Sequence, residues 1–543
     1  MLQTFRVRGR FPPEIPTMQT LNSPRRANLA SVLTSLLAVT AFLAASWQAR
    51  AESPAAVPGD SGFVASGSMI TLAHHTPPQV LDGRAVRVDH YNPEQKLRLV
   101  LVVQPPKMAE EEQFLKELTT KGNPNFHKFL SPDQWNARFG PSVEAEQKVV
   151  DWAQSVGLTV TNRYSNRLLV DVEGTAGTIE KALGVTINNY KVGEEVDFSN
   201  DRDPVISASL SGVVSGVLGL NSIQRIHGRM PKSRTMKGPD YTPGPMVNKY
   251  KSANGDGDPV KADAHRKAGA AGRTDVAPEL AQGDLTGNST TVSPFWVFSS
   301  QGYDYDGLQQ FSHCCNVHND SGGAPAVSSI SLVTFGDYED SDVQAFFTYY
   351  GFAWNYNSTI IGGSTPPGQD DEAPGDLEYS TATANSFGSW VDTAEVSVYE
   401  VTNGYYSTYA DAYNQIATDN NSRVVSTSYG GTEDSWNEYG DAVGTGAGQF
   451  HGIFNTMTGE GYTLIASAGD NGSADGCADA VQVDWPAADP NFIAAGGTGL
   501  TFNSDGTFKS EVAWTGDTWE NACGQNWGGG GGGASALFSQ PYW

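Results

Sequence analysis

The segment RVVSTSYG, from Arg423 to Gly430, is a short apolar run that ends in small polar residues. After residue 301 the chain holds four more such runs, namely SSISLVTF (Ser328–Phe335), EVSVYEV (Glu395–Val401), YTLIASAGD (Tyr462–Asp470) and NFIAAGG (Asn491–Gly497). Helical stretches such as YYSTYADAYNQIATD separate them. Near-continuously apolar strands that alternate with helices are typical of a parallel sheet covered on both faces. We therefore expect an α/β fold for residues 301–543, with functional groups at the carboxyl ends of the strands.

Residues 62–227 predict a smaller unit. We expect strands at Leu97–Gln104, Leu168–Gly174 and Ile187–Val192, and helices near Glu110–Lys121, Ala145–Ser155 and Ala176–Leu183. Strands alternating with helices in a unit of this size favour a two-layer α+β sandwich. Residues 228–300 are rich in Gly and Pro, as in KGPDYTPGP, and predict a flexible, cleavable linker.

The N-terminal 51 residues have the pattern of a secretory signal peptide. Arg25 and Arg26 precede an apolar run, and Ala49-Arg50-Ala51 has the form of a cleavage site. A membrane anchor is the alternative, but the uninterrupted apolar part is shorter than the roughly 20 residues that a spanning helix needs. We therefore expect a secreted, extracellular protein without stable membrane association.

The four cysteines all follow this segment, and in an exported protein they are candidates for disulfides. Cys477 with Cys523 is the preferred bridge. His313, Cys314, Cys315 and His318 could also form a metal cluster, although their spacing matches no zinc pattern.

Charge is distributed unevenly along the chain. The net charge is -26, and from residue 301 onward 31 Asp and Glu accompany only two basic residues, Arg423 and Lys509. A strongly negative domain repels nucleic acid and anionic membranes, so those partners are not expected. The composition also suits an acidic setting, in which carboxylates take up protons.

The stretch GQDDEAPGDLEYS, from Gly368 to Ser380, contains two carboxylates four residues apart, Glu372 and Asp376. On a helix they would share one face and hold a single proton, an arrangement that can act as a general base at acidic pH. A solvated helix start is the simpler reading of these acids. Asp470, at a strand end, could stay protonated and donate to an oxyanion, or form an Asx-turn.

Several segments resemble one peptidase family. FHKFLSPDQWNARFGPS and RLLVDVEGTAGTIEKALGVTINNY resemble the pro-segment of the sedolisins, the kumamolisin-like serine-carboxyl peptidases. The start of the sedolisin catalytic domain resembles, in order, ISLVTFGDYEDSDVQAFFTYYG, EAPGDLEYS, VVSTSYG, IASAGDNGS, VDWPAADPNFIAAGGTGL and WGGGGGGASALFSQPYW. The resemblance implies a subtilisin-like parallel sheet with helices on both faces, incomplete here, after a ferredoxin-like α+β pro-domain. It divides the chain into a signal peptide (1–51), a pro-domain (62–227), a linker (228–300) and a partial peptidase domain (301–543).

The resemblance also implies roles for individual residues. Glu372, in a pattern that continues to Asp376 and Glu378, would take the proton of a nucleophilic serine, with Asp376 behind it. Asp470 would serve the oxyanion hole. The strand that pairs with substrate backbone would carry Ser426, Ser428 and Gly430, and the glycines 528–533 would line the cleft.

Two features depart from the family pattern. Pro374-Gly375 lies between the two carboxylates, which a helix tolerates if it starts there. The family's Gly-Thr-Ser nucleophile sequence is absent, because Gly497-Thr498-Gly499 matches a decoy and Ser535 a loop residue. We expect a sequence cut short before the serine, with the family's Ca²⁺ loop beyond Trp543.

These observations predict the zymogen of a secreted, acid-acting serine-carboxyl endopeptidase, inactive in this form. Its partners would be protein or peptide substrates and its own pro-domain. A non-catalytic exported peptide-binding pseudoenzyme is the alternative. A glycosidase is a third class, which would need its two carboxylates about 5 Å or more apart across a sugar cleft.

Overall fold

The computed structural model describes residues 68–193, 195–226, 329–350, 354–363, 372–384, 395–433, 446–473, 481–502, 508–517 and 528–541. The chain divides into two units, Met1–Ser66 and Gly67–Trp543. The signal peptide, the linker and all four cysteines lie outside the described residues. Following the resemblance, which these labels do not prove, we label residues 68–226 the pro-region and residues 329–541 the peptidase region.

A six-stranded parallel sheet forms the centre of the peptidase region. Its spatial order is β11–β12–β10–β13–β15–β17. The strands are β10 (Ser329–Thr334), β11 (Tyr356–Ile361), β12 (Glu395–Val401), β13 (Val424–Thr427), β15 (Thr463–Ser467) and β17 (Phe492–Ala495). The predicted α/β fold with a parallel sheet is therefore confirmed, and all five predicted strands are present.

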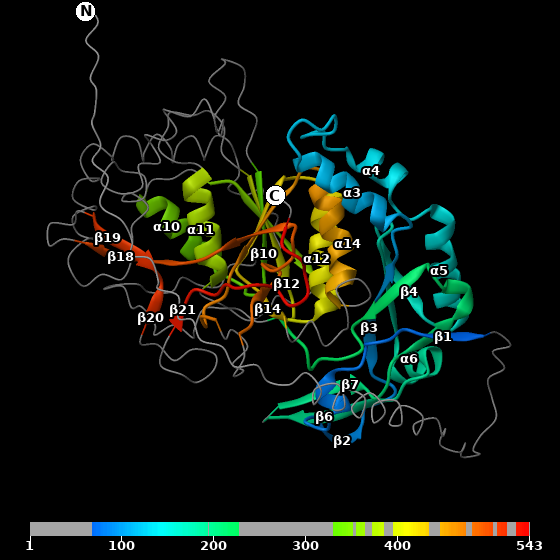
Figure 1. Ribbon diagram of the computed structural model, residues 1–543. Coiled ribbons are helices and arrows are strands. Elements are labelled where there is room, and N and C mark those ends of the chain that lie inside the picture. Colours follow the sequence, from blue (N-terminus) through cyan, green and yellow to red (C-terminus); the bar gives the residue numbers. More distant parts are fainter. Residues whose placement is uncertain are drawn as a thin grey trace, which may run out of the picture. The chain divides into compact units, whose positions relative to one another are not determined.

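Helices cover both faces of this sheet (Figure 1). Helices α10 (Asp340–Tyr350) and α11 (Glu372–Ala384) pack on one face, where Val396 and Val398 of β12 point. Helices α12 (Tyr406–Asp419) and α14 (Gly446–Gly459) pack on the other face, against Tyr399 and Val401. The strand order reverses at β10, which makes the carboxyl ends of β10 and β13 the expected position for a site.

Shorter strands follow and surround the sheet. These are β14 (Gly431–Thr432), β16 (Asp484–Trp485), β18 (Thr498–Phe502), β19 (Phe508–Ala513), β20 (Thr515–Asp517) and β21 (Gly528–Gly529). They form three antiparallel pairs, β14–β16, β18–β19 and β20–β21.

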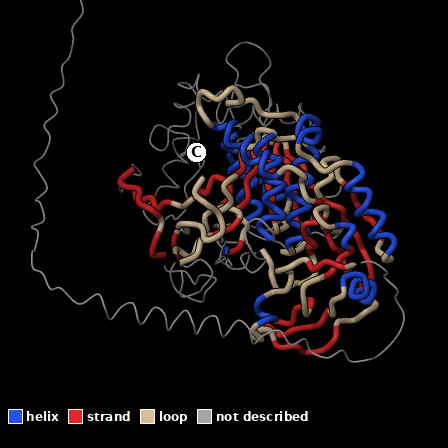
Figure 2. Tube along the Cα trace, turned by 45° about the vertical axis from the view of Figure 1, so that its right-hand side comes forward, coloured by secondary structure: helices blue, strands red, loops and turns tan. Residues whose placement is uncertain are grey.

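The pro-region is an antiparallel sheet of order β4–β5–β3–β9 with helices on one face. Its strands are β3 (Lys96–Val103), β4 (Thr159–Arg163), β5 (Leu169–Thr175) and β9 (Val214–Leu218). Helix α5 (Val143–Ser155) connects β3 to β4, and α6 (Ala176–Leu183) follows β5, which is the split βαβ topology of a ferredoxin-like unit. Figure 2 shows its helices and strands along the Cα trace.

Insertions extend this unit. They are β1 (Met69–Thr71) with β8 (Val205–Ser207), the sheet of β2 (Val86–His90), β6 (Ile187–Val192) and β7 (Glu195–Asn200), and helices α2 (Pro78–Leu81), α3 (Met108–Thr119) and α4 (Pro132–Arg138).

Strand β3 is buried on both faces. Leu99 and Leu101 point into the core of the pro-region, beside α5 and α6. The alternate residues Val100 and Val102 join the core cluster that contains Tyr413 of α12 and Phe454 of α14. Since successive side chains of a strand point to opposite faces, one strand connects the cores of both regions.

Arg98 lies on the same face of β3 as Val100 and makes a buried ionic contact between the regions. Its Nη2 donates to Asp171 Oδ2 at 2.9 Å and also to Asp411 Oδ2 on α12. The carboxylate side chains of Asp171 and Asp411 are 3% and 2% exposed, so two buried acids share a single cation. Burial raises the pKa of Asp411 and nearby Asp171 adds to the rise, while Arg98 opposes it.

Trp135 of α4 is the largest fully buried side chain of the pro-region. Its helix begins with a capping box formed by Ser131 and Gln134. The indole Nε1 donates to Thr456 Oγ1 of α14 at 3.0 Å, and a Cβ on Gly459 would lie 1.8 Å from Trp135 Cζ3. The pro-region therefore contacts α14 where the helix has no side chain.

We predict that Gly459→Ala destabilises the protein by about 3 kcal/mol, because the added methyl group overlaps the indole. In a Trp135→Ala background the same substitution should cost much less, since the space is then empty. Urea unfolding measures both effects. Gly496→Ala is the control, because its Cβ meets nothing within 4 Å, and an equal loss in the two glycine variants would contradict the packing.

Arg98→Met should destabilise the protein by about 3–5 kcal/mol at pH 7, because two buried carboxylates lose their shared cation. A carboxyl whose pKa is raised in the folded state contributes stability at low pH and loses it as pH rises through that pKa. Without Arg98 the pKa of Asp411 rises further, so the loss should shrink towards pH 4. Urea unfolding at both pH values tests this; the exposed, paired Arg84, changed to Met, should cost no more than about 0.5 kcal/mol.

Candidate active site

Helix α11 begins at Glu372, so Pro374 and Gly375 fall in its first turn, where proline is tolerated. Ala373 and Leu377 are buried in the core cluster that α11 shares with the sheet. Glu372 is also buried, at 7% exposure, and Asp376 is half-buried. Glu372 and Asp376 therefore both lie within α11, four residues apart, which places their carboxylates on one side of the helix as predicted.

The end of β13 meets this helix. Ser428, the first residue after β13, donates from Oγ to Asp376 Oδ1 at 2.9 Å. Asp376 and Ser428 are 52 residues apart in sequence. The bond connects the predicted acid pair to the carboxyl end of the sheet, beside the reversal of strand order at β10.

Ser426 has a different environment. It lies inside β13, opposite Leu332 of β10 on one side and Ile465 of β15 on the other. A central strand leaves no free edge, so the expectation that Ser426 pairs with substrate backbone does not fit its position. A peptide strand could align only with residues beyond Thr427.

Gly430 is enclosed by the strand pair that follows β13. A Cβ on Gly430 would lie 2.3 Å from the carbonyl oxygen of Trp485 and 2.8 Å from Asp484 Oδ2. The absence of a side chain thus permits β14 and β16 to pack here, which accounts for the glycine without reference to substrate.

Asp470 follows β15, the strand beside β13. It is half-buried, and its carbonyl oxygen accepts from Gly529 N at 2.9 Å. Gly531 N donates to Gly469 O at 2.8 Å, and a Cβ on Gly531 would lie 1.9 Å from Ala468 O. The glycine run 528–533 therefore packs against the strand end that carries Asp470.

Two further acids near the site are not members of the pair. Glu378 lies on α11 two residues after Asp376 and so points elsewhere; burial, with nearby Asp342 of α10, raises the pKa of Glu378 to about 8. Glu433 is buried and accepts from Ser535 Oγ and from Ala536 N. Ser535 Oγ also accepts the N–H groups of Leu537 and Phe538, which is the geometry of a structural turn.

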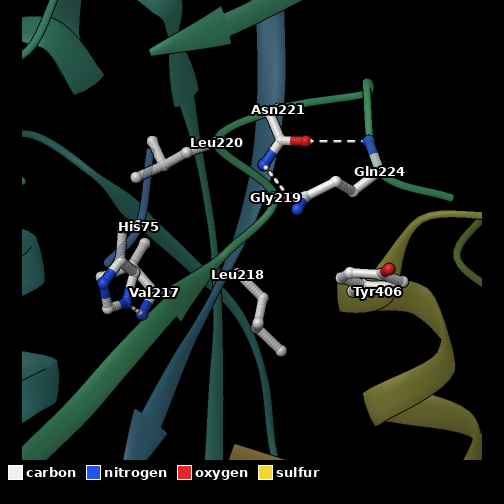
Figure 3. A pocket seen from close by; sticks show the side chains of 8 residues that line it. All are labelled: His75, Val217, Leu218, Gly219, Leu220, Asn221, Gln224 and Tyr406. Atoms are coloured by element: carbon white, nitrogen blue, oxygen red, sulfur yellow. Dashed lines mark hydrogen bonds between the residues drawn. The ribbon is translucent and has the colours of Figure 1, made fainter. Parts of the chain in front are cut away.

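A small pocket lies elsewhere, between the pro-region and α12 (Figure 3). Asn221 and Gln224 bond to one another at its rim, and Tyr406 of α12 lies on the opposite side. His75 accepts the Val217 N–H at 3.1 Å, and burial lowers the pKa of His75. The pocket contains none of the predicted site residues.

Within the described residues, no three His, Cys, Asp or Glu side chains form a cluster that could hold a metal ion. The calcium loop that the resemblance implies is expected beyond Trp543, so that site stays a prediction. In the same part of the chain, no helix has the length and apolar character to cross a membrane.

Comparison with known proteins agrees with the sequence resemblance. Residues 84–223 match the pro-kumamolisin activation domain. The chain is 25% identical over 487 residues to sedolisin of Pseudomonas sp. (strain 101), covering 87% of this chain and 71% of that protein. It is 24% identical over 488 residues to kumamolisin of Bacillus sp. (strain MN-32), and the alignment covers 87% of this chain and 72% of that protein.

Xanthomonalisin of Xanthomonas sp. (strain T-22) is 25% identical over 474 residues, which are 83% of this chain and 50% of that protein. Among solved structures, the serine-carboxyl proteinase sedolisin of Pseudomonas, complexed with two molecules of pseudo-iodotyrostatin, aligns with a TM-score of 0.34 and 26% identity over 41% of this chain and 62% of that one. The relatives and the activation domain together support a peptidase family with a pro-domain.

Gly531→Ala should destabilise the protein by about 1–3 kcal/mol, because its methyl group would meet the carbonyl oxygen of Ala468. The adjacent Gly530→Ala is a matched control, since its Cβ has only ordinary contacts at 3.6–4.0 Å, and it should change stability by no more than about 0.5 kcal/mol. Thermal unfolding compares them, and equal effects would show that the glycine run does not pack on the strand.

Proposed function

We propose that the chain, a sedolisin-family protein with a pro-domain, is the zymogen of a secreted serine-type endopeptidase that acts at acidic pH. The observation that carries the proposal is the meeting of the Glu372–Asp376 helix with the end of β13, through the bond from Ser428 to Asp376. Its substrates would be proteins or peptides, the class that peptidase homologues imply.

In the proposed mechanism, a serine attacks the peptide carbonyl while Glu372 takes its proton. Glu372 then returns the proton to the leaving amine, and an acyl-enzyme forms. A carboxylate suits this task at acidic pH, where histidine would be protonated. Asp376 supports the charge on Glu372, and a protonated Asp470 donates a hydrogen bond to the oxyanion.

The pro-region supports the zymogen assignment. It covers α12 and α14 through Arg98, Val100 and Trp135. Its last described residue, Ile226, donates from N to Gly404 O at 2.8 Å, just before α12 begins. We propose that cleavage within the following linker releases this region.

The proposed nucleophile is a serine outside these 543 residues, because Gly-Thr-Ser does not occur among them. We therefore expect the present chain to release no peptides from a denatured protein substrate at pH 3–5. Turnover that is measurable and lost in Asp470→Ala would contradict this expectation.

The function itself is tested on the longer reading frame. We expect a Gly-Thr-Ser within about the next hundred codons after Trp543, enough to complete a domain of ordinary size. In that protein Glu372→Gln should lower kcat at least about 100-fold at pH 4. Glu395→Gln, at the amino end of β12, is the matched carboxylate control and should keep its activity. A stop codon directly after Trp543 would instead favour the peptide-binding pseudoenzyme.

A further inference from the structure

The contact between Ser428 and Asp376 points to a role for the side chain of Ser428 that its sequence match does not imply. The hydroxyl of Ser428 donates to Asp376 Oδ1 at 2.9 Å in a partly buried position. The side chain of Ser428 thus contacts the acid pair directly. Nothing in the spacing of the two segments predicts this contact, since they are 52 residues apart.

The backbone on both sides of Ser428 is held in place. Thr427 Oγ1 donates to Val333 O at 3.0 Å and accepts from Tyr429 N at 3.2 Å. Tyr429 is 1% exposed, and Gly430 fits closely against Trp485. The hydroxyl is therefore presented from a rigid part of the sheet, which is what precise orientation of a neighbouring group requires.

A donor on one member of a carboxylate pair makes the two members unequal. Two carboxylates one helical turn apart disfavour double ionisation. A hydrogen bond to the ionised form favours ionisation of the group that accepts it. The hydroxyl of Ser428 thus favours a charged Asp376, and a charged Asp376 increases the proton affinity of Glu372.

We propose that Ser428 is a positioning residue of the acid pair: its hydroxyl orients the Asp376 carboxylate and keeps it ionised, so that Glu372 is the member that gains the proton. The inference rests on the proposed function, because it explains why Glu372 acts as the base. It gives the side chain of Ser428 a role in addition to the substrate pairing that the resemblance implies for the strand.

Other ionisable groups lie on the elements that pack against α11. Glu378 lies on α11 itself and Asp342 on the adjacent α10; the buried Glu400 belongs to β12, and the buried Tyr338, near Glu400, precedes α10. Burial raises the pKa of Glu378 to about 8, so Glu378 stays protonated over an acidic titration. Asp342 and Glu400 are the same in the parent and in a Ser428 variant, so the difference between the two titrations isolates the pair.

The test is a carboxyl titration of the whole chain, labelled with ¹³C at the Asp and Glu side-chain carboxyls and followed by NMR from pH 2 to 7. In Ser428→Ala we expect the ionisation constant of Asp376 to fall about tenfold, the scale of one charge-assisted hydrogen bond, and that of Glu372 to rise. Ser428→Thr, which keeps a hydroxyl, should restore the parent titration. Asp376→Asn identifies the signal that moves.

Ser380→Ala is the matched control. Ser380 lies on α11 one turn after Asp376, and its hydroxyl bonds to Leu377 O at 3.3 Å. This variant should titrate like the parent. If Ser428→Ala fails to fold, Ser428→Cys keeps the size of the side chain and weakens the donor, and should shift the titration in the same direction.

An unchanged titration in a folded Ser428→Ala protein, or a rise in the ionisation constant of Asp376, would overturn the proposal. A shift that Ser380→Ala reproduces would also overturn it. The titration needs no peptide hydrolysis, so it is independent of the kinetic test of Glu372 that decides the proposed function.

Discussion

The structure depends on one shared hydrophobic cluster. Val100 and Val102 of the pro-region are buried in the same cluster as Tyr413 and Phe454 of the peptidase region. An antiparallel sheet commonly packs one face on a core and leaves the other to water. Here the second face of the pro-region sheet is also buried, because Val100 and Val102 pack against α12 and α14. The pro-region therefore buries a substantial part of its apolar surface on these two helices. The two regions therefore stabilise one another by the ordinary hydrophobic effect.

The contacts between the two regions and the proposed active site lie in different parts of the structure. The pro-region packs on the face of the parallel sheet formed by α12 and α14, whereas the acid pair lies on α11, on the opposite face. The carboxyl ends of β13 and β15 lie between these layers and carry Ser428 and Asp470. Contacts between the two regions are thus made by different residues from those proposed to perform chemistry.

Sequence patterns predicted the elements whose apolar residues follow the period of a buried strand or of an amphipathic helix. The run EVSVYEV became β12 with the predicted bounds, and AGTIEKAL became α6. Strand β11 was missed because its residues Asn357, Ser358 and Thr359 are polar, as an edge strand permits. Helix α14 was missed because its four glycines weaken helix propensity, and tertiary packing overrides that weakness.

The candidate site was predictable from the sequence only for residues that are close together along the chain. The spacing of Glu372 and Asp376 requires nothing beyond a helix, which the sequence allowed despite Pro374. The bonds of Asp376 to Ser428 and of Arg98 to Asp411 cross 52 and 313 residues. They arise from the order of strands and from the docking of two regions, which no short motif encodes. The central position of Ser426 likewise became evident only from the sheet order.

The capping box at the start of α4 has a consequence for the fluorescence of the protein. By fixing the start of that short helix, Ser131 and Gln134 help to hold the indole of Trp135 away from water, against α14. Departure of the pro-region would hydrate that ring, and the emission of a hydrated indole lies at longer wavelength. Trp135 is thus one intrinsic fluorophore whose emission would respond to separation of the two regions.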